Sequence, residues 1–212
     1  MAIQQKLETP TPPNLGYPPE LYERRNFNES NGALNAYFRK VTSVLGALFG
    51  VKGSRYINAP YGAFQSTADQ TAAAINTAYA MTFNTTDYTN GVTVASNSRI
   101  TVTDSGIYNF QWSGQFQNTD SQDHDARIWI KVNGTNLIGS TGFVGIPSKH
   151  GSVNGHTIVG WNYFLSLDAN DYIELWWETD STAVSIQAYA AASNYPSTAS
   201  LIATMQFVSN TM

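Results

Sequence analysis

The side chains best suited to acid–base or metal chemistry are three histidines and a short acidic loop. His124, His150 and His156 lack a metal-ligand spacing such as His-x-x-x-His. Ser152 does not stand in the Gly-x-Ser-x-Gly turn of a serine hydrolase. We interpret these residues as ordinary surface side chains, and the sequence predicts a protein that is not an enzyme.

The acidic loop contains Asp120, Asp123 and Asp125. Three carboxylates this close could bind Ca²⁺, although the spacing lacks the full EF-hand ligand set and its glycine. A solvated loop without metal is the alternative that we favour. Asp168 and Asp171 suit a turn better than a catalytic acid/base pair. No other cofactor is indicated.

The composition excludes several classes of protein. Charged residues make up 12% of the 212 residues, which is about half the usual share, and there is no cysteine. Disulfide scaffolds, thiol nucleophiles and cysteine-bound metals are therefore excluded. No apolar run approaches the roughly 20 residues of a membrane span, and the polar, proline-rich N-terminus is unlike a signal peptide. We expect synthesis in a cytoplasm.

Charge divides the chain near residue 58. Residues 1–58 hold seven Lys/Arg against four Glu, whereas residues 59–212 hold four basic against eleven acidic residues. The net negative larger part disfavours binding to phosphate backbones. We predict no nucleic-acid partner, and we expect the two parts to face different surroundings.

Residues 1–27 contain five of the eight prolines. Proline favours extended conformations and opposes helix, so this stretch predicts an extended attachment arm, with a disordered tail as the alternative. Its apolar and basic side chains are candidates for anchoring the chain to a partner: Tyr17, Leu21, Tyr22, Arg24, Arg25 and Phe27.

A helical period follows over residues 28–50. Asn26 and Glu29 could form a capping box, and Gly50 suits the end of the helix. An apolar stripe would lie exposed on a lone helix, so we expect it to pack on copies of itself or on a partner; packing on its own domain is the alternative. The stripe consists of Leu34, Tyr37, Val41, Val44 and Leu48. Residues 51–58 read as a linker.

From residue 59 onward apolar and polar residues alternate with a period of two, which is typical of β-strands. In the densest stretch, 107–117, four aromatic residues share one face: Tyr108, Phe110, Trp112 and Phe116. Asn133-Gly134 predicts a hairpin turn. Short strands without intervening helices favour an antiparallel sandwich. We expect strands at 61–66, 79–83, 91–94, 99–103, 107–117, 126–132, 136–144, 156–167, 171–178, 184–192 and 200–208.

The same alternation predicts which side chains point away from the core. On one sheet these residues are candidates for a contact between chains: Asn109, Gln111, Gln115, Ile158, Asn162 and Phe164. Trp129 and Trp176 stand opposite apolar neighbours on their strands, so their rings could fill an interface between chains or stack on a sugar.

These motifs resemble the C1q/TNF-like jelly roll over residues 60–209. The central strand of that family carries glycine and then alternating aromatics, as at Gly106, Tyr108, Phe110 and Trp112. Two further motifs are similar: Phe83, Asn84, Asp87 and Tyr88 upstream, and Leu165, Leu167, Asp171, Ile173 and Leu175 downstream, while Ala63-Phe64 matches the first strand. The resemblance implies a ten-stranded antiparallel sandwich that assembles as a homotrimer.

The whole chain also resembles C1q-like virion structural proteins of tailed phages of marine bacteria. The segments that carry this resemblance are residues 18–28, Tyr37-Phe38 and residues 57–64. It implies a trimeric fibre, spike or decoration protein, assembled in the host cytoplasm, with a head over 59–209. Residues 1–50 would dock on a capsid, collar or tail protein. A host-surface glycan-binding adhesin is the alternative.

Overall fold

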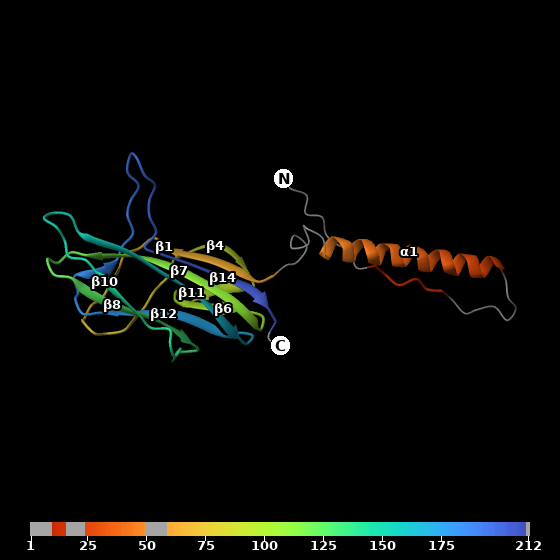
Figure 1. The fold of residues 1–212 in the computed structure, drawn as a ribbon, viewed down its shortest axis with the longest axis horizontal. Helices are drawn as coiled ribbons and strands as arrows, with labels where there is room; N and C mark the ends of the chain where they lie inside the picture. Colours follow the sequence, from red (N-terminus) through yellow and green to blue (C-terminus); the bar gives the residue numbers. More distant parts are fainter. Residues whose placement is uncertain (1–9, 16–23, 50–58, 211–212) are drawn as a thin grey trace. The chain divides into compact units, whose positions relative to one another are not determined.

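A computed structural model describes residues 10–15, 24–49 and 59–210. The chain divides into two compact units, residues 1–58 and 59–212. The fold is mainly β, with one helix and two antiparallel sheets (Figure 1). Among the described residues, no helix is long and apolar enough to cross a membrane.

The helix α1 spans Arg24–Phe49 and therefore begins four residues before its expected start. The predicted capping box at Asn26 is wrong, because Asn26 lies inside the helix. The last proline upstream is Pro19, so nothing at residues 24–27 opposes the helical conformation. Arg24, Arg25 and Phe27 consequently belong to the helix and not to an extended arm.

Two sheets of seven strands each build the second unit (Figure 1). The first sheet contains β1 (Tyr61–Ser66), β2 (Gln70–Thr71), β4 (Thr85–Asn90), β7 (Gly106–Asn118), β11 (Gly155–Leu167), β13 (Val184–Ile186) and β14 (Leu201–Ser209). The second contains β3 (Tyr79–Ala80), β5 (Val92–Ala95), β6 (Arg99–Val102), β8 (His124–Val132), β9 (Thr135–Asn136), β10 (Gly142–Ile146) and β12 (Tyr172–Thr179).

The long strands pair in a nested order, in which strands near the two ends of the sequence of this unit pair with each other and the pairing continues toward the middle of that sequence. β1 pairs with β14 and β6 with β12, and then β7 pairs with β11 and β8 with β10. All of these pairs are antiparallel. The first sheet therefore runs β4-β1-β14-β7-β11, and the second runs β5-β6-β12-β8-β10.

The core lies between the sheets and is centred on β7, as the period-two pattern predicted. Tyr108, Phe110, Trp112 and Phe116 are all buried. Phe116 meets Trp177 of the opposite sheet edge-to-face, with ring centroids 5.9 Å apart. Such a pair adds about 0.5–1.5 kcal/mol beyond the buried area. The Tyr108 hydroxyl donates to the Asp104 carbonyl, which gives this buried polar atom a partner.

The turns explain where the expected strands were right or wrong. Asn133 and Gly134 both have positive φ, as the predicted hairpin turn requires. The expected strand 136–144 is interrupted because Gly139 also has positive φ (+82°) and a turn joins Leu137 to Ser140. The strand β4 was not predicted, since its sequence is almost entirely polar.

Candidate functional site

The two sheets differ sharply in formal charge. Four neighbouring strands of the first sheet, β1, β14, β7 and β11, contain no Asp, Glu, Lys or Arg. The middle strands of the second sheet carry six charged residues: Arg99, Asp125, Arg127, Lys131, Glu174 and Glu178. Because water-facing surfaces are normally rich in charge, this contrast singles out the first sheet.

Several charged side chains of the second sheet have partners on its own outer face. Arg127 Nη1 lies 2.8 Å from Glu178 Oε1. Lys131 Nζ lies 3.5 Å from the centroid of the Trp176 ring and covers that ring. Trp176 pairs across the strands with Trp129, whose indole N–H donates to Asn136. Both predicted outward tryptophans thus lie on the charged sheet, and both are half-buried.

The outer face of the first sheet exposes apolar side chains among amides. Ile158 and Phe164 of β11 are 70% and 64% exposed, and Ile202 of β14 is 46% exposed. An alternating strand presents its outer residues side by side with those of its neighbours. We call this surface the uncharged face; it comprises Asn109, Gln111, Ser113, Gln115, Ile158, Asn162, Phe164, Ile202, Thr204 and Gln206.

The six residues predicted to form a contact between chains on the sheets all lie on the uncharged face. In the β7–β11 register, Ile158 stands opposite Gln115 and Phe164 opposite Asn109, while Asn162 stands opposite Gln111. The sequence did not place the β14 residues on this face. Their contribution follows from the register in which Thr204 stands opposite Gln111, and no motif fixed that register.

The helix presents a second apolar surface. All five predicted stripe residues are half-buried: Leu34, Tyr37, Val41, Val44 and Leu48. Among the side chains described on α1, residues 24–48, none is fully buried, and Phe38 is 60% exposed. The stripe thus retains apolar surface that a further contact could cover.

The residues predicted to anchor the chain divide into two groups. Arg24, Arg25 and Phe27 are exposed on the first turns of α1, where Arg25 also pairs with Glu29 at 2.9 Å. The other three candidates, Tyr17, Leu21 and Tyr22, lie outside the described residues.

The acidic loop directs its carboxylates to separate partners. Asp120 lies 2.9 Å from His124, and this hydrogen bond is the main reason that the Asp120 pKa is lowered. Asp123 accepts from the Ser148 backbone N–H, which lowers the pKa of Asp123. Asp125 has its carboxyl on the exposed side of β8. Within the described residues, no three His, Asp or Glu side chains form a group able to bind a metal.

His124 has an environment that the sequence did not indicate. Its second ring nitrogen lies 3.2 Å from Asp180, which is distant in sequence. The side chain is mostly buried and joins the β7–β8 loop to the end of β12. His150 lies in a tight turn with Val153, and His156 lies on β11.

A hairpin beside the uncharged face is a further feature that sequence reasoning missed. The expected strand 184–192 instead leaves the sheet after β13 (Figure 1). Gln187 N–H donates to the Gln115 carbonyl and Gln115 N–H donates to the Ser200 carbonyl, so the chain leaves and rejoins the sheet opposite one residue of β7. We call residues 188–199 the finger. The Asn-Tyr-Pro-Ser turn signal at 194–197 was available in the sequence.

No protein-family model matches the sequence, and no curated protein is significantly similar to it.

Proposed function

We propose that this chain is a non-enzymatic structural protein of a phage particle, and that three copies associate through the uncharged face. The observation that carries the proposal is the lack of formal charge on β1, β7, β11 and β14, combined with the exposure of Ile158, Phe164 and Ile202. On a free chain, the surface that becomes the centre of a protein interface is poor in charged residues and exposes large apolar side chains.

The strand order supports a jelly-roll head of the C1q/TNF type. A jelly roll is in effect one long hairpin wound into two sheets, so its first strand pairs with its last and the pairing continues inwards. The pairs β1–β14, β6–β12, β7–β11 and β8–β10 follow this scheme. Within the described residues, ten strands contain four or more residues, as such a head would have.

The division of the chain into two units supports a role in which the N-terminal unit attaches to a particle and the β-sheet unit projects from it. Residues 1–58 form a unit separate from residues 59–212, and the two differ in the sign of their net charge. The half-buried stripe of α1 would gather the three chains, and residues 1–50 would dock on a capsid, collar or tail protein. The virion assignment itself rests on the sequence resemblance described above.

The proposal is tested by one substitution on each sheet. Phe164→Asp places a charge on the uncharged face, and Phe143→Asp is its matched control, since Phe143 is 69% exposed on the second sheet. Losing a central apolar contact that carries much of the binding energy costs about 2 kcal/mol or more, so we expect F164D to weaken association at least about tenfold. The dissociation constant is measured by analytical ultracentrifugation.

Both substitutions are at exposed positions, so the melting temperature of each variant should stay close to that of the wild type. F143D should associate like the wild type. Equal association constants for F164D and F143D would exclude the uncharged face as the contact between chains.

A further inference from the structure

The finger carries almost no structure of its own beyond its base. At the base, Tyr189 and Thr198 exchange two backbone hydrogen bonds, and nearer the tip only one bond joins Ala192 to Tyr195 among the described contacts. Residues 190–197 are all exposed, with Tyr195 at 54%. A two-stranded hairpin without a packed face is marginally stable in water.

The base of the finger, by contrast, is fixed to the sheet. The Tyr189 hydroxyl lies 3.0 Å from Gln117 Oε1 and 3.1 Å from His156 Nδ1. The Ala188 N–H donates to Asp69 Oδ1 at 2.9 Å. The finger therefore projects from a defined position beside the uncharged face (Figure 1), and the residues of its tip, 192–196, are exposed.

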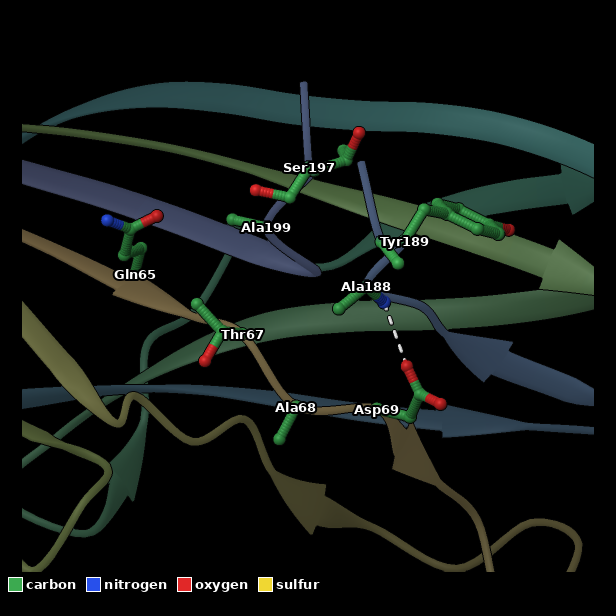
Figure 2. Close-up of a pocket in the computed structure, with 10 residues that line it drawn as sticks. Gln65, Thr67, Ala68, Asp69, Ala188, Tyr189, Ser197 and Ala199 are labelled. Carbon is green, nitrogen blue, oxygen red and sulfur yellow. Dashed lines mark hydrogen bonds between the residues drawn. The ribbon is translucent and has the colours of Figure 1, made fainter. Parts of the chain in front are cut away.

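A recess of about 530 Å³ opens at the side of the finger that faces β1. Figure 2 shows it between the segment that follows β1 and the two arms of the finger. Its lining is Gln65, Thr67, Ala68, Asp69, Ala188, Tyr189, Ala190, Ser197, Thr198 and Ala199. The alanines form apolar surface, and Asp69 is the single formally charged residue in this lining.

The chemistry of the recess matches that of the finger tip. Asp69 is oriented by the Ala188 N–H, and the Gln187 amide nitrogen lies 3.1 Å from both carboxylate oxygens when it faces them. With Asp69 bonded within its own chain, the remaining polar groups of the recess are neutral hydroxyls and an amide, which both donate and accept and so suit a neutral polar partner. The tip, with the sequence Ala-Ser-Asn-Tyr-Pro over 192–196, is uncharged and supplies the Asn194 amide and the Tyr195 hydroxyl.

We propose that the finger tip of one copy fills this recess on the next copy. The inference rests on the proposed self-association and adds its geometry. The tip of the finger and the recess at its base are different patches of one surface, so the contact is heterologous, and such contacts close into a ring when the rotation between copies allows it. A ring of three would give every finger a recess and every recess a finger.

The test uses disulfides, because the chain contains no cysteine. In the full chain, N194C at the tip is combined with T67C at the rim of the recess. Both wild-type side chains are exposed in the single chain. Under mild oxidation we expect covalent dimers and trimers on a non-reducing gel. The matched control pairs N194C with I138C, since Ile138 is 99% exposed on the β9–β10 loop, and it should stay monomeric on that gel.

The outcomes separate this inference from the function on which it rests. If the wild type forms trimers but the N194C/T67C variant gives only uncrosslinked or internally crosslinked chains, the inference is overturned while the proposed self-association stands. If the wild type is monomeric, both the contact between finger tip and recess and the proposed self-association are wrong. A neutral saccharide that protects T67C from alkylation in the trimer would assign the recess to another occupant and would also overturn the inference.

A second variant checks the same contact without cysteine. Because Tyr189 and Thr198 already pair, residues 190–197 can be replaced by an Asn-Gly turn that closes the shortened hairpin. We expect the trimer of this variant to dissociate at least about tenfold more readily, as loss of a central contact would cause. Unchanged association would contradict the proposal.

Discussion

At the scale of the residue, Gly142 is tied to the packing of Trp161. A Cβ built on Gly142 would lie 2.1 Å from the Trp161 ring, whereas a Cβ on Gly145 of the same strand meets nothing closer than 3.8 Å. Forcing extra atoms into a packed site costs about 1–3 kcal/mol. We therefore expect Gly142→Ala to lower the free energy of unfolding by that amount, measured by urea denaturation.

Gly145→Ala is the matched control, since both glycines lie on β10 and neither has positive φ. It should change stability by less than about 0.5 kcal/mol, as surface substitutions usually do. An equal loss in the two variants would show that Trp161 does not pack against Gly142 in the way described.

Two aspartates of the acidic loop predict how stability depends on pH. The Asp120 pKa is lowered chiefly by the hydrogen bond to His124 and that of Asp123 by the Ser148 backbone, both from a usual value of 3.8. Because the folded chain holds these protons less tightly than the unfolded chain, the stabilisation is complete above the unfolded pKa. It is lost as the pH falls through the lower, folded values.

The measurement is the melting temperature of the wild type and of the double variant D120N/D123N between about pH 6 and about pH 3, a range that spans the unfolded pKa. Asparagine keeps a hydrogen-bond acceptor but does not titrate. The wild type should lose more stability on acidification than the variant. Parallel curves would show that neither carboxylate contributes through its pKa.

At the scale of the element, the alternation of apolar and polar residues predicted which side chains of a strand point into the core and which point outward. The aromatic row on β7 and the outward residues of β11 were placed on the correct faces, because one buried side fixes the register of a strand. β4 was missed because Asp87 and its threonine and asparagine neighbours lack alternation. Its position comes from pairing with β1, which no local pattern encodes.

The finger shows a different limit of the sequence. The alternation that begins at Val184 continues beyond Gln187, so a strand was predicted through residue 192. The chain leaves the sheet because Gln115 of β7 bonds to both Gln187 and Ser200, which leaves no free position in the ladder for the residues between them. That constraint is tertiary, and so the recess beside the finger was not predictable either.

The helix yields a prediction at the same scale. Val41 lies on the half-buried stripe of α1, whereas the neighbouring Thr42 is exposed. If the stripe gathers the chains, Val41→Asp buries a charge in the contact and should weaken association at least about tenfold. Analytical ultracentrifugation of the full chain measures this change.

Thr42→Asp is the control and should leave the association constant unchanged. The melting temperature of the unit 59–212 should be the same in both variants, because α1 belongs to the other unit. If V41D and T42D associate alike, the stripe does not join the chains.

At the scale of the whole molecule, the distribution of charge offers two routes to association. Opposite net charges on residues 1–58 and 59–212 would favour contacts between unlike units, and salt would weaken such contacts. Contacts through the uncharged face involve no ion pairs, so salt should affect them little. In a particle, we expect density with three-fold symmetry at the point where the chain attaches.

The mass of the full chain in solution shows whether three copies associate. It is measured by light scattering at about physiological and about 1 M ionic strength, and at 1 M charges are screened beyond roughly 3 Å. We expect three times the 23.2 kDa chain mass under both conditions. A single-chain mass, or a trimer that dissociates in high salt, would contradict this expectation.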